Sequence, residues 1–188
     1  MDITEPAEPE RLHRTVVYES RWVNLYRDRV RLSTGRVLDA YHVLDFGLGS
    51  VVVIVRNDFD EVLLERVARY PTGTTTWELP AGGIESGETA IVAAQREVRE
   101  ETGYETENHS CLYSYHPLNG ISNLQITVVT CEAGRRTREI DKDEISDIRW
   151  FARDELSGML QRREITDGLA LVGLLLHLQR TPGSQRSS

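Results

Sequence analysis

Cysteine and long apolar runs are scarce in this chain of 188 residues, and its 22 basic residues are outnumbered by 30 acidic ones. Its two cysteines, Cys111 and Cys131, fall in stretches that favour strands and belong to no CxxC pair or Cys/His cluster. We therefore expect two buried, reduced thiols rather than a disulfide or a zinc site. No run approaches the roughly 18 consecutive apolar residues of a membrane-spanning helix. The polar, acidic start lacks the features of a signal peptide, so we expect a cytoplasmic protein without a membrane partner.

Excess positive charge is absent as well. The formal net charge is −8 at pH 7, whereas proteins that bind nucleic-acid backbones usually present a basic face. Nucleic acid is therefore not an expected partner. Small anionic ligands are still compatible with this charge, because a bound divalent metal reverses the local sign.

Alternating and apolar runs predict a chain that begins with strands and ends with helices. The expected strands cover residues 15–18, 22–32, 36–44, 50–55, 61–66, 75–79, 111–115, 124–131 and 147–151. The expected helices cover residues 89–102, ended by Gly103, a segment near 153–162, and 167–180 with Asp167 as N-cap. Gly82 and Gly83 are expected in a loop after Pro80. This order favours a mixed sheet flanked by helices over a regular βαβ repeat.

Three glutamates on one side of the first expected helix indicate a cation site. Glu97, Glu100 and Glu101 are spaced i, i+3 and i+4, which places them within an arc of roughly 100°. They repel one another, and the helix dipole near this C-terminus favours cations. Mg²⁺ or Mn²⁺ would relieve the repulsion, because both prefer oxygen ligands. The alternative is a solvated acidic face with Arg96 and Arg99 as ordinary ion-pair partners.

The segment around these glutamates resembles the Nudix box. That pattern is Gly, five residues, Glu, seven residues, then Arg-Glu-apolar-any-Glu-Glu-any-Gly-apolar. Gly82 and Glu88 fill the first two fixed positions, and REVREETGY at 96–104 fills the rest, with Tyr104 as the one soft match. Seven fixed positions, each met by chance in about 7% of cases, give odds on the order of 10⁻⁸ per starting point.

The resemblance implies an α/β fold, namely an α/β/α sandwich with a mixed sheet, and hydrolysis of a nucleoside diphosphate linked to another group. In such families the glutamates matching Glu97 and Glu101 bind metal, Glu100 often shares that work, and the carbonyl matching Ala81 is a frequent further ligand. The arginine matching Arg96 usually orients the glutamates. The implied cofactor is Mg²⁺ or Mn²⁺, which would neutralise the pyrophosphate and activate a water.

A candidate base lies in the acidic segment 139–147. By similarity to sugar-nucleotide Nudix enzymes, Glu144 would complete the removal of a proton from the attacking water. An ordinary solvated loop is the alternative interpretation of this segment.

A looser resemblance to ADP-ribose and sugar-nucleotide pyrophosphatases covers most of the chain. In that group a leading antiparallel sheet, here 12–46, is exchanged between the subunits of a homodimer, and the hydrolase domain, here 47–180, follows it. Residues 1–11 and 181–188 are expected to be disordered tails. An aromatic residue of the leading sheet commonly stacks on the base. Trp22 is the candidate here, with a role in a dimer interface or a core as the alternative.

The same resemblance supplies candidates for contact with the rest of the substrate. Arg69 matches an arginine that often touches the phosphates, with surface pairing as the alternative, and Glu78 belongs to the same element. His116 and Asn119 are candidates for the sugar site, although surface loop positions explain them as well. Val67 replaces a glutamine found in many relatives, which weakens any transfer of base recognition.

The resemblance therefore implies a nucleoside diphosphate sugar, ADP-ribose included, without selecting the sugar. Two alternatives are open. One is another Nudix substrate, such as a nucleoside triphosphate or a dinucleoside polyphosphate. The other is a module that senses ADP-ribose without cutting it, although such a module would be expected to carry a degraded box.

Overall fold

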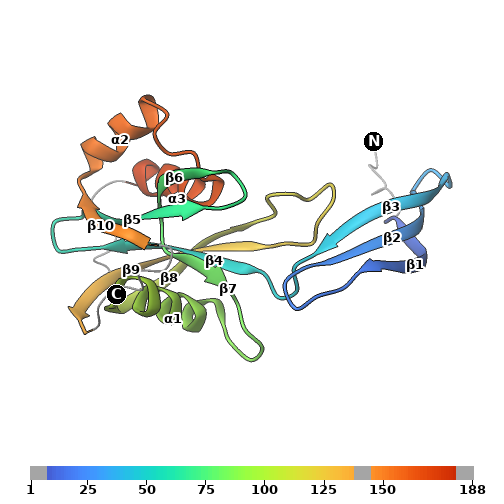
Figure 1. Ribbon diagram of the computed structural model, residues 1–188, viewed down its shortest axis with the longest axis horizontal. Coiled ribbons are helices and arrows are strands. Elements are labelled where there is room, and N and C mark those ends of the chain that lie inside the picture. Colours follow the sequence, from blue (N-terminus) through green and yellow to red (C-terminus); the bar gives the residue numbers. More distant parts are fainter. Residues whose placement is uncertain (1–7, 138–144, 181–188) are drawn as a thin grey trace, which may run out of the picture. The chain divides into compact units, whose positions relative to one another are not determined.

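The computed structural model describes residues 8–137 and 145–180 and is drawn in Figure 1. The described residues fall into two compact units. The first contains the chain up to Gly49 together with His116–Gln125, and the second contains Ser50–Tyr115 and the chain from Ile126 onward.

The first unit is a small antiparallel sheet with the strand order β1-β2-β3. Its strands are β1 (Glu10–Tyr18), β2 (Asn24–Arg31) and β3 (Val37–Asp45). Hydrogen bonds attach the segment 116–125 to β3, one of them from Asn123 Nδ2 to Asp45 Oδ1 at 2.9 Å. The Leu44 N–H donates to the Ile121 carbonyl at 2.8 Å, and the Tyr41 hydroxyl donates to the Gly120 carbonyl at 2.6 Å.

The second unit is built on a mixed sheet with the strand order β10-β5-β4-β9-β8, in which β6 also pairs with β5 and β7 with β4. Its strands are β4 (Ser50–Arg56), β5 (Val62–Arg69), β6 (Thr74–Glu78), β7 (Ala81–Gly83), β8 (Tyr104–Tyr115), β9 (Ile126–Arg136) and β10 (Ile145–Phe151). The pair β4–β9 is parallel and the other pairs are antiparallel.

Helices cover both faces of this sheet (Figure 1). They are α1 (Ala90–Thr102), α2 (Arg153–Gln161) and α3 (Gly168–Gln179). Successive residues of a strand point to opposite faces. Along β4, Val51, Val53 and Val55 belong to the buried cluster under α1, and Ile54 lies beside Gly173 of α3. The expected α/β/α sandwich with a mixed sheet is therefore confirmed, as is the additional antiparallel sheet at the N-terminus.

The ends of the helices follow from local sequence. The Thr89 hydroxyl accepts a hydrogen bond from the Val92 N–H at 3.3 Å, and Gly103 ends α1 with φ of 77°. Left-handed backbone is accessible to glycine without strain, so Gly103 suits this position. Asp167 caps α3 by accepting from the Ala170 N–H at 2.7 Å. The helix and cap expected at each of these places are confirmed.

Two expectations about glycine and cysteine are wrong. Gly82 and Gly83 belong to strand β7, because Gly82 pairs with Val51 of β4. Cys111 is exposed, whereas Cys131 is buried as expected. Cys111 lies on β8, the last strand of the sheet path, which has a neighbouring strand on one edge only.

Several strand boundaries also differ from the expected ones. Strand β1 begins at Glu10, and β8 begins at Tyr104 directly after α1. Strand β2 begins only at Asn24, so Trp22 lies in a bend before it. In the part of the chain that the structure describes, no helix is long and apolar enough to cross a membrane.

Candidate functional site

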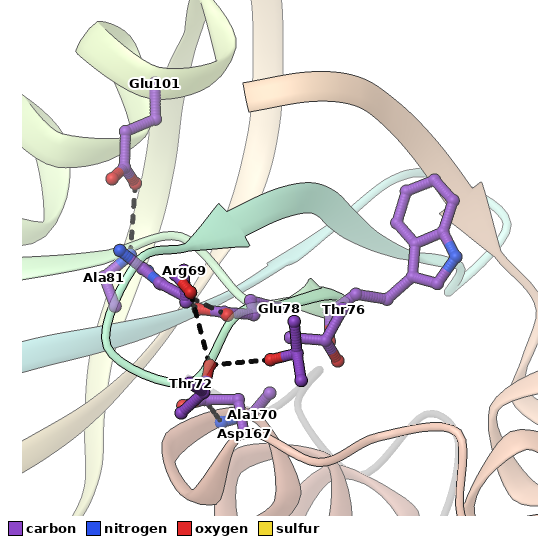
Figure 2. Close-up of polar contacts among 10 residues, drawn as sticks. Arg69, Thr72, Thr76, Glu78, Ala81, Glu101, Asp167 and Ala170 are labelled. Atoms are coloured by element: carbon purple, nitrogen blue, oxygen red, sulfur yellow. Dashed lines mark hydrogen bonds and ion pairs between the residues drawn. The ribbon is translucent and has the colours of Figure 1, made fainter. Parts of the chain in front are cut away.

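The three glutamates of α1 differ in exposure. Burial of Ala94 and Val98 under the sheet fixes the rotation of the helix about its axis. The Glu97 side chain is then only 13% exposed, whereas that of Glu100 is 48% exposed. Glu101 is half-buried, and its carboxylate turns toward the backbone of β7 (Figure 2). A solvated acidic face therefore describes Glu100 but neither of the other two.

Arg96 connects the start of α1 to its acidic side. Its Nε and Nη2 donate to the two Glu88 oxygens at 2.8 and 2.9 Å, and Nη1 donates to Glu97 Oε1 at 2.7 Å. Nη2 also donates to the Gly83 carbonyl at 2.7 Å, and Glu100 Oε2 lies 3.5 Å from Nη1. Hydrogen bonds from Arg96 lower the pKa of Glu88 to about 2. Such a planar, multidentate contact suits arginine and not lysine.

Strand β7 approaches the same glutamates with its backbone. The Ala81 N–H donates to Glu101 Oε2 at 3.1 Å (Figure 2). A Cβ atom added to Gly82 would lie 2.0 Å from Glu97 Oε1, far inside any contact distance, whereas one on Gly83 would meet nothing within 4 Å. Glycine at position 82 is thus required for the observed place of the Glu97 carboxylate.

Sequence reasoning missed a fourth carboxylate, that of Glu65. It lies on β5, 1% exposed, directly across the strand pair from Glu78 of β6, which is 3% exposed. Its Oε2 atom has no hydrogen-bond partner among the described residues. Burial, together with the negative charge of Glu78, raises the pKa of Glu65, and burial together with Glu65 and Glu97 raises the pKa of Glu101. The signal in the sequence was the spacing of two residues from Leu63 to Glu65 and from Glu65 to Val67, which places the glutamate on the same strand face as two buried apolar residues.

Arg69 pairs with Glu78 at the end of β5. Its Nη2 lies 2.7 Å from Glu78 Oε2, and its Nε lies 3.2 Å from both carboxylate oxygens (Figure 2). The arginine side chain is partly exposed, while the carboxylate is buried. This pair therefore joins a buried anion to a cation that still reaches solvent, unlike an ordinary surface ion pair.

The remaining candidates belong to the first unit or fall outside the described residues. Trp22, His116 and Asn119 belong to the first unit, whereas all the residues described above belong to the second. Trp22 is 73% exposed, so a core role within this chain is excluded. His116 Nδ1 lies 2.8 Å from the Leu124 carbonyl oxygen, and the Asn119 side chain is exposed. The candidate base Glu144 lies outside the described residues.

The donor chemistry of the α1 cluster fits a hard divalent cation. Carboxylate and backbone carbonyl oxygens are the ligands that Mg²⁺ and Mn²⁺ prefer, and Glu97, Glu101, Glu65 and Ala81 supply them. Burial and the neighbouring carboxyl groups of Glu65 and Glu97 raise the pKa of Glu101, and a nearby cation would favour its charged form. Within residues 8–137 and 145–180, however, no three acidic, histidine or cysteine side chains already form a coordination group. Arg96 instead holds the Glu97 carboxylate.

Comparison with known families gives two matches that together span most of the chain. Residues 48–169 match the model described as NUDIX domain. Residues 10–44 match the model described as nucleoside diphosphate sugar hydrolase N-terminal domain.

Individual proteins resemble the chain over most of its length. An ADP-ribose pyrophosphatase of Mycobacterium tuberculosis is 27% identical over 176 residues, covering 91% of this chain and 81% of its own. A CMP-5'-(N-acetyl-N-hydroxy-3-aminopropyl)phosphonate hydrolase of Streptomyces rubellomurinus is 28% identical over 162 residues, covering 85% of this chain and 77% of its own. A solved structure described as an ADP compounds hydrolase has the same fold, with a TM-score of 0.76 at 19% identity, over 90% of this chain and 92% of its own.

Proposed function

Because the chain belongs to the NUDIX family, we propose that it is a metal-dependent pyrophosphatase acting on nucleoside diphosphate sugars, ADP-ribose included. The products are a nucleoside monophosphate and a sugar phosphate. The observation that carries this proposal is the pair of shielded carboxylates, Glu97 and Glu101, beside the backbone of Ala81 and Gly82. The N-terminal match to nucleoside diphosphate sugar hydrolases supports the choice of substrate class.

The residues that would hold Mg²⁺ are Glu97, Glu101 and the carbonyl of Ala81, with the exposed Glu100 available to complete the ligands. A bound Mg²⁺ supplies charge neutralisation at the pyrophosphate oxygens and favours a deprotonated water. Arg96 positions Glu97 through the hydrogen bond at 2.7 Å. This arrangement keeps the acidic side of α1 ordered before any substrate arrives.

Hydrolysis needs one water and the transfer of its proton. The water oxygen forms a bond to phosphorus while the bridging P–O bond breaks, and one phosphate group leaves with the bridging oxygen. Glu144 is the proposed acceptor of the water proton. Arg69, which reaches solvent while paired with Glu78, is the proposed contact of a phosphate oxygen, because guanidinium groups match phosphate geometry.

The first unit is proposed to bind the base and to form a homodimer through residues 12–46. The proposed hydrolase domain follows in the sequence at 47–180. Trp22 would stack on the base, with His116 and Asn119 near the sugar. The support is a group of exposed apolar side chains on β1 and after it, since such groups often mark interfaces. They are Val16, Val17, Tyr18 and Trp22. Light scattering after size exclusion tests this, and a monomer mass at micromolar concentration would contradict it.

The substrate class is tested with a panel of ADP-ribose, GDP-mannose, UDP-glucose, diadenosine polyphosphates and nucleoside triphosphates, each with Mg²⁺ or EDTA. Anion-exchange chromatography resolves the products. We expect a sugar nucleotide to give a nucleoside monophosphate and a sugar phosphate in equal amounts. A Trp22→Ala variant should raise KM for that substrate and leave kcat nearly unchanged, because stacking acts on binding.

Other outcomes identify the alternatives. Cleavage of triphosphates or dinucleoside polyphosphates alone would keep the NUDIX chemistry and refute the sugar substrate. The Streptomyces relative, described as the hydrolase of a CMP-linked phosphonate, is the reason to add a CMP ester to the panel. Binding of ADP-ribose without cleavage would favour a sensing module.

A further inference from the structure

Glu65 is buried beside the proposed metal ligands but lies outside the Nudix box. Its strand alternates so that Leu63, two residues earlier, packs in the cluster under α1. Glu65 shares that face and stands directly opposite Glu78 on β6. Burial and the charge of the nearby Glu65 carboxyl raise the pKa of Glu101 in α1.

The surroundings of this carboxyl do not satisfy it. Its Oε2 atom is buried and has no hydrogen-bond partner among the described residues. The nearby Arg69 donates from Nε and Nη2 to Glu78. Burial of a carboxyl group without full pairing destabilises a fold, and an apolar residue would be the stable choice at such a position. Unsatisfied buried groups of this kind concentrate at functional sites, where a ligand completes them.

We propose that Glu65 is a further carboxylate ligand of the divalent cation held by Glu101, contributed by β5 rather than by the box helix. This inference rests on the metal dependence in the proposed function. A cation between Glu65 and Glu101 would supply the partner that Oε2 lacks and would offset the repulsion among Glu65, Glu78 and Glu101. The inner end of the metal site is then formed by two elements, β5 and α1.

The test measures Mn²⁺ binding directly, without substrate, by isothermal titration and by electron paramagnetic resonance of free Mn²⁺. The variants are Glu65→Gln, Glu101→Gln and, as matched control, Glu107→Gln, which changes an exposed glutamate of β8. Loss of one ligand should weaken Mn²⁺ binding by at least about tenfold in Glu65→Gln, since even outer-shell changes have effects of that size. The control should bind as the wild-type protein does.

The melting temperature of Glu65→Gln without metal gives a second readout. If Glu65 had only a structural role, this variant would melt at a lower temperature than wild type. Without metal, Glu65→Gln should unfold at the same temperature as wild type or a higher one, because it replaces a buried carboxyl group whose Oε2 has no partner among the described residues. With saturating Mn²⁺, its gain in melting temperature should be smaller than that of wild type. A Glu65→Gln protein that is less stable without metal yet binds Mn²⁺ normally would overturn the inference.

The proposed metal dependence and the role of Glu65 are refuted by different results. If wild type, Glu65→Gln and Glu107→Gln all bind no Mn²⁺, the proposed metal dependence fails, and Glu65 has no cation to bind. If wild type and Glu65→Gln bind Mn²⁺ equally while Glu101→Gln does not, the proposed function stands and the role of Glu65 is refuted.

Discussion

Replacement of Gly82 by alanine perturbs the carboxylate cluster without removing any of its side chains. The new Cβ would lie 2.0 Å from Glu97 Oε1, whereas ordinary contacts begin at 3.4 Å, so the carboxylate must shift by about 1.4 Å. A displacement of about 1 Å in an active site can lower the rate about 100-fold. That factor corresponds to about 2.7 kcal/mol in transition-state stabilisation. We therefore expect kcat/KM of Gly82→Ala to fall about 100-fold.

Stability should change little, because the displaced atoms are the end of a flexible side chain. We expect the free energy of unfolding to change by less than about 1 kcal/mol, or a melting temperature within about 4 °C of wild type. Gly83→Ala is the matched control, since its Cβ meets nothing within 4 Å. The assay is the steady-state rate on the best sugar nucleotide with Mg²⁺. Equal rates for the two alanine variants would refute the role assigned to the Glu97 position.

Three further predictions concern the charges around the site and in α3. Arg96→Lys cannot keep the contacts to Glu88, Glu97 and the Gly83 carbonyl together, so Mn²⁺ affinity measured by titration should fall about 10–100-fold. Arg69→Met leaves Glu78 buried without this partner, so the free energy of unfolding, measured with urea, should fall by about 1–3 kcal/mol. The double variant Arg69→Met/Glu78→Gln should recover most of that loss. Burial lowers the pKa of His177, which is near Asp60, Arg153, Arg56 and Arg180. The unfolded chain therefore binds the proton more readily, so the stability from the neutral imidazole is present above about pH 6.5 and is lost as pH falls below it. His177→Gln should reduce the decrease in melting temperature between pH 7.5 and pH 5. A decrease equal to that of wild type would contradict this.

The box and its helix were predictable because their signals are local. A helix at 89–102 follows from apolar positions at helical spacing and the terminal Gly103, and the structure has α1 at Ala90–Thr102. The spacing of Glu97, Glu100 and Glu101 predicts a shared side. It does not predict which glutamates become buried, because that depends on the sheet under Ala94 and Val98.

Features that depend on strand pairing were missed. Gly82 and Gly83 favour a loop by composition, yet pairing with β4 makes them a strand. Glu65 belongs to the segment EVLLER, and a glutamate near the end of a strand normally faces water. Its burial depends on the pairing of β5 with β6, where it lies opposite Glu78. The exposure of Cys111 likewise depends on β8 being the last strand of the sheet path.

The central claim is that the carboxylates of α1 form a metal-dependent hydrolytic centre. The most direct measurement is the initial rate of nucleoside monophosphate release from the best-cleaved sugar nucleotide, by wild type and Glu101→Gln, with Mg²⁺ and with EDTA. We expect release only by wild type with Mg²⁺, and a rate at least about 100-fold lower in the other three conditions, since loss of a metal ligand removes charge stabilisation in the transition state. Equal release by Glu101→Gln, or release that persists in EDTA, would contradict the account.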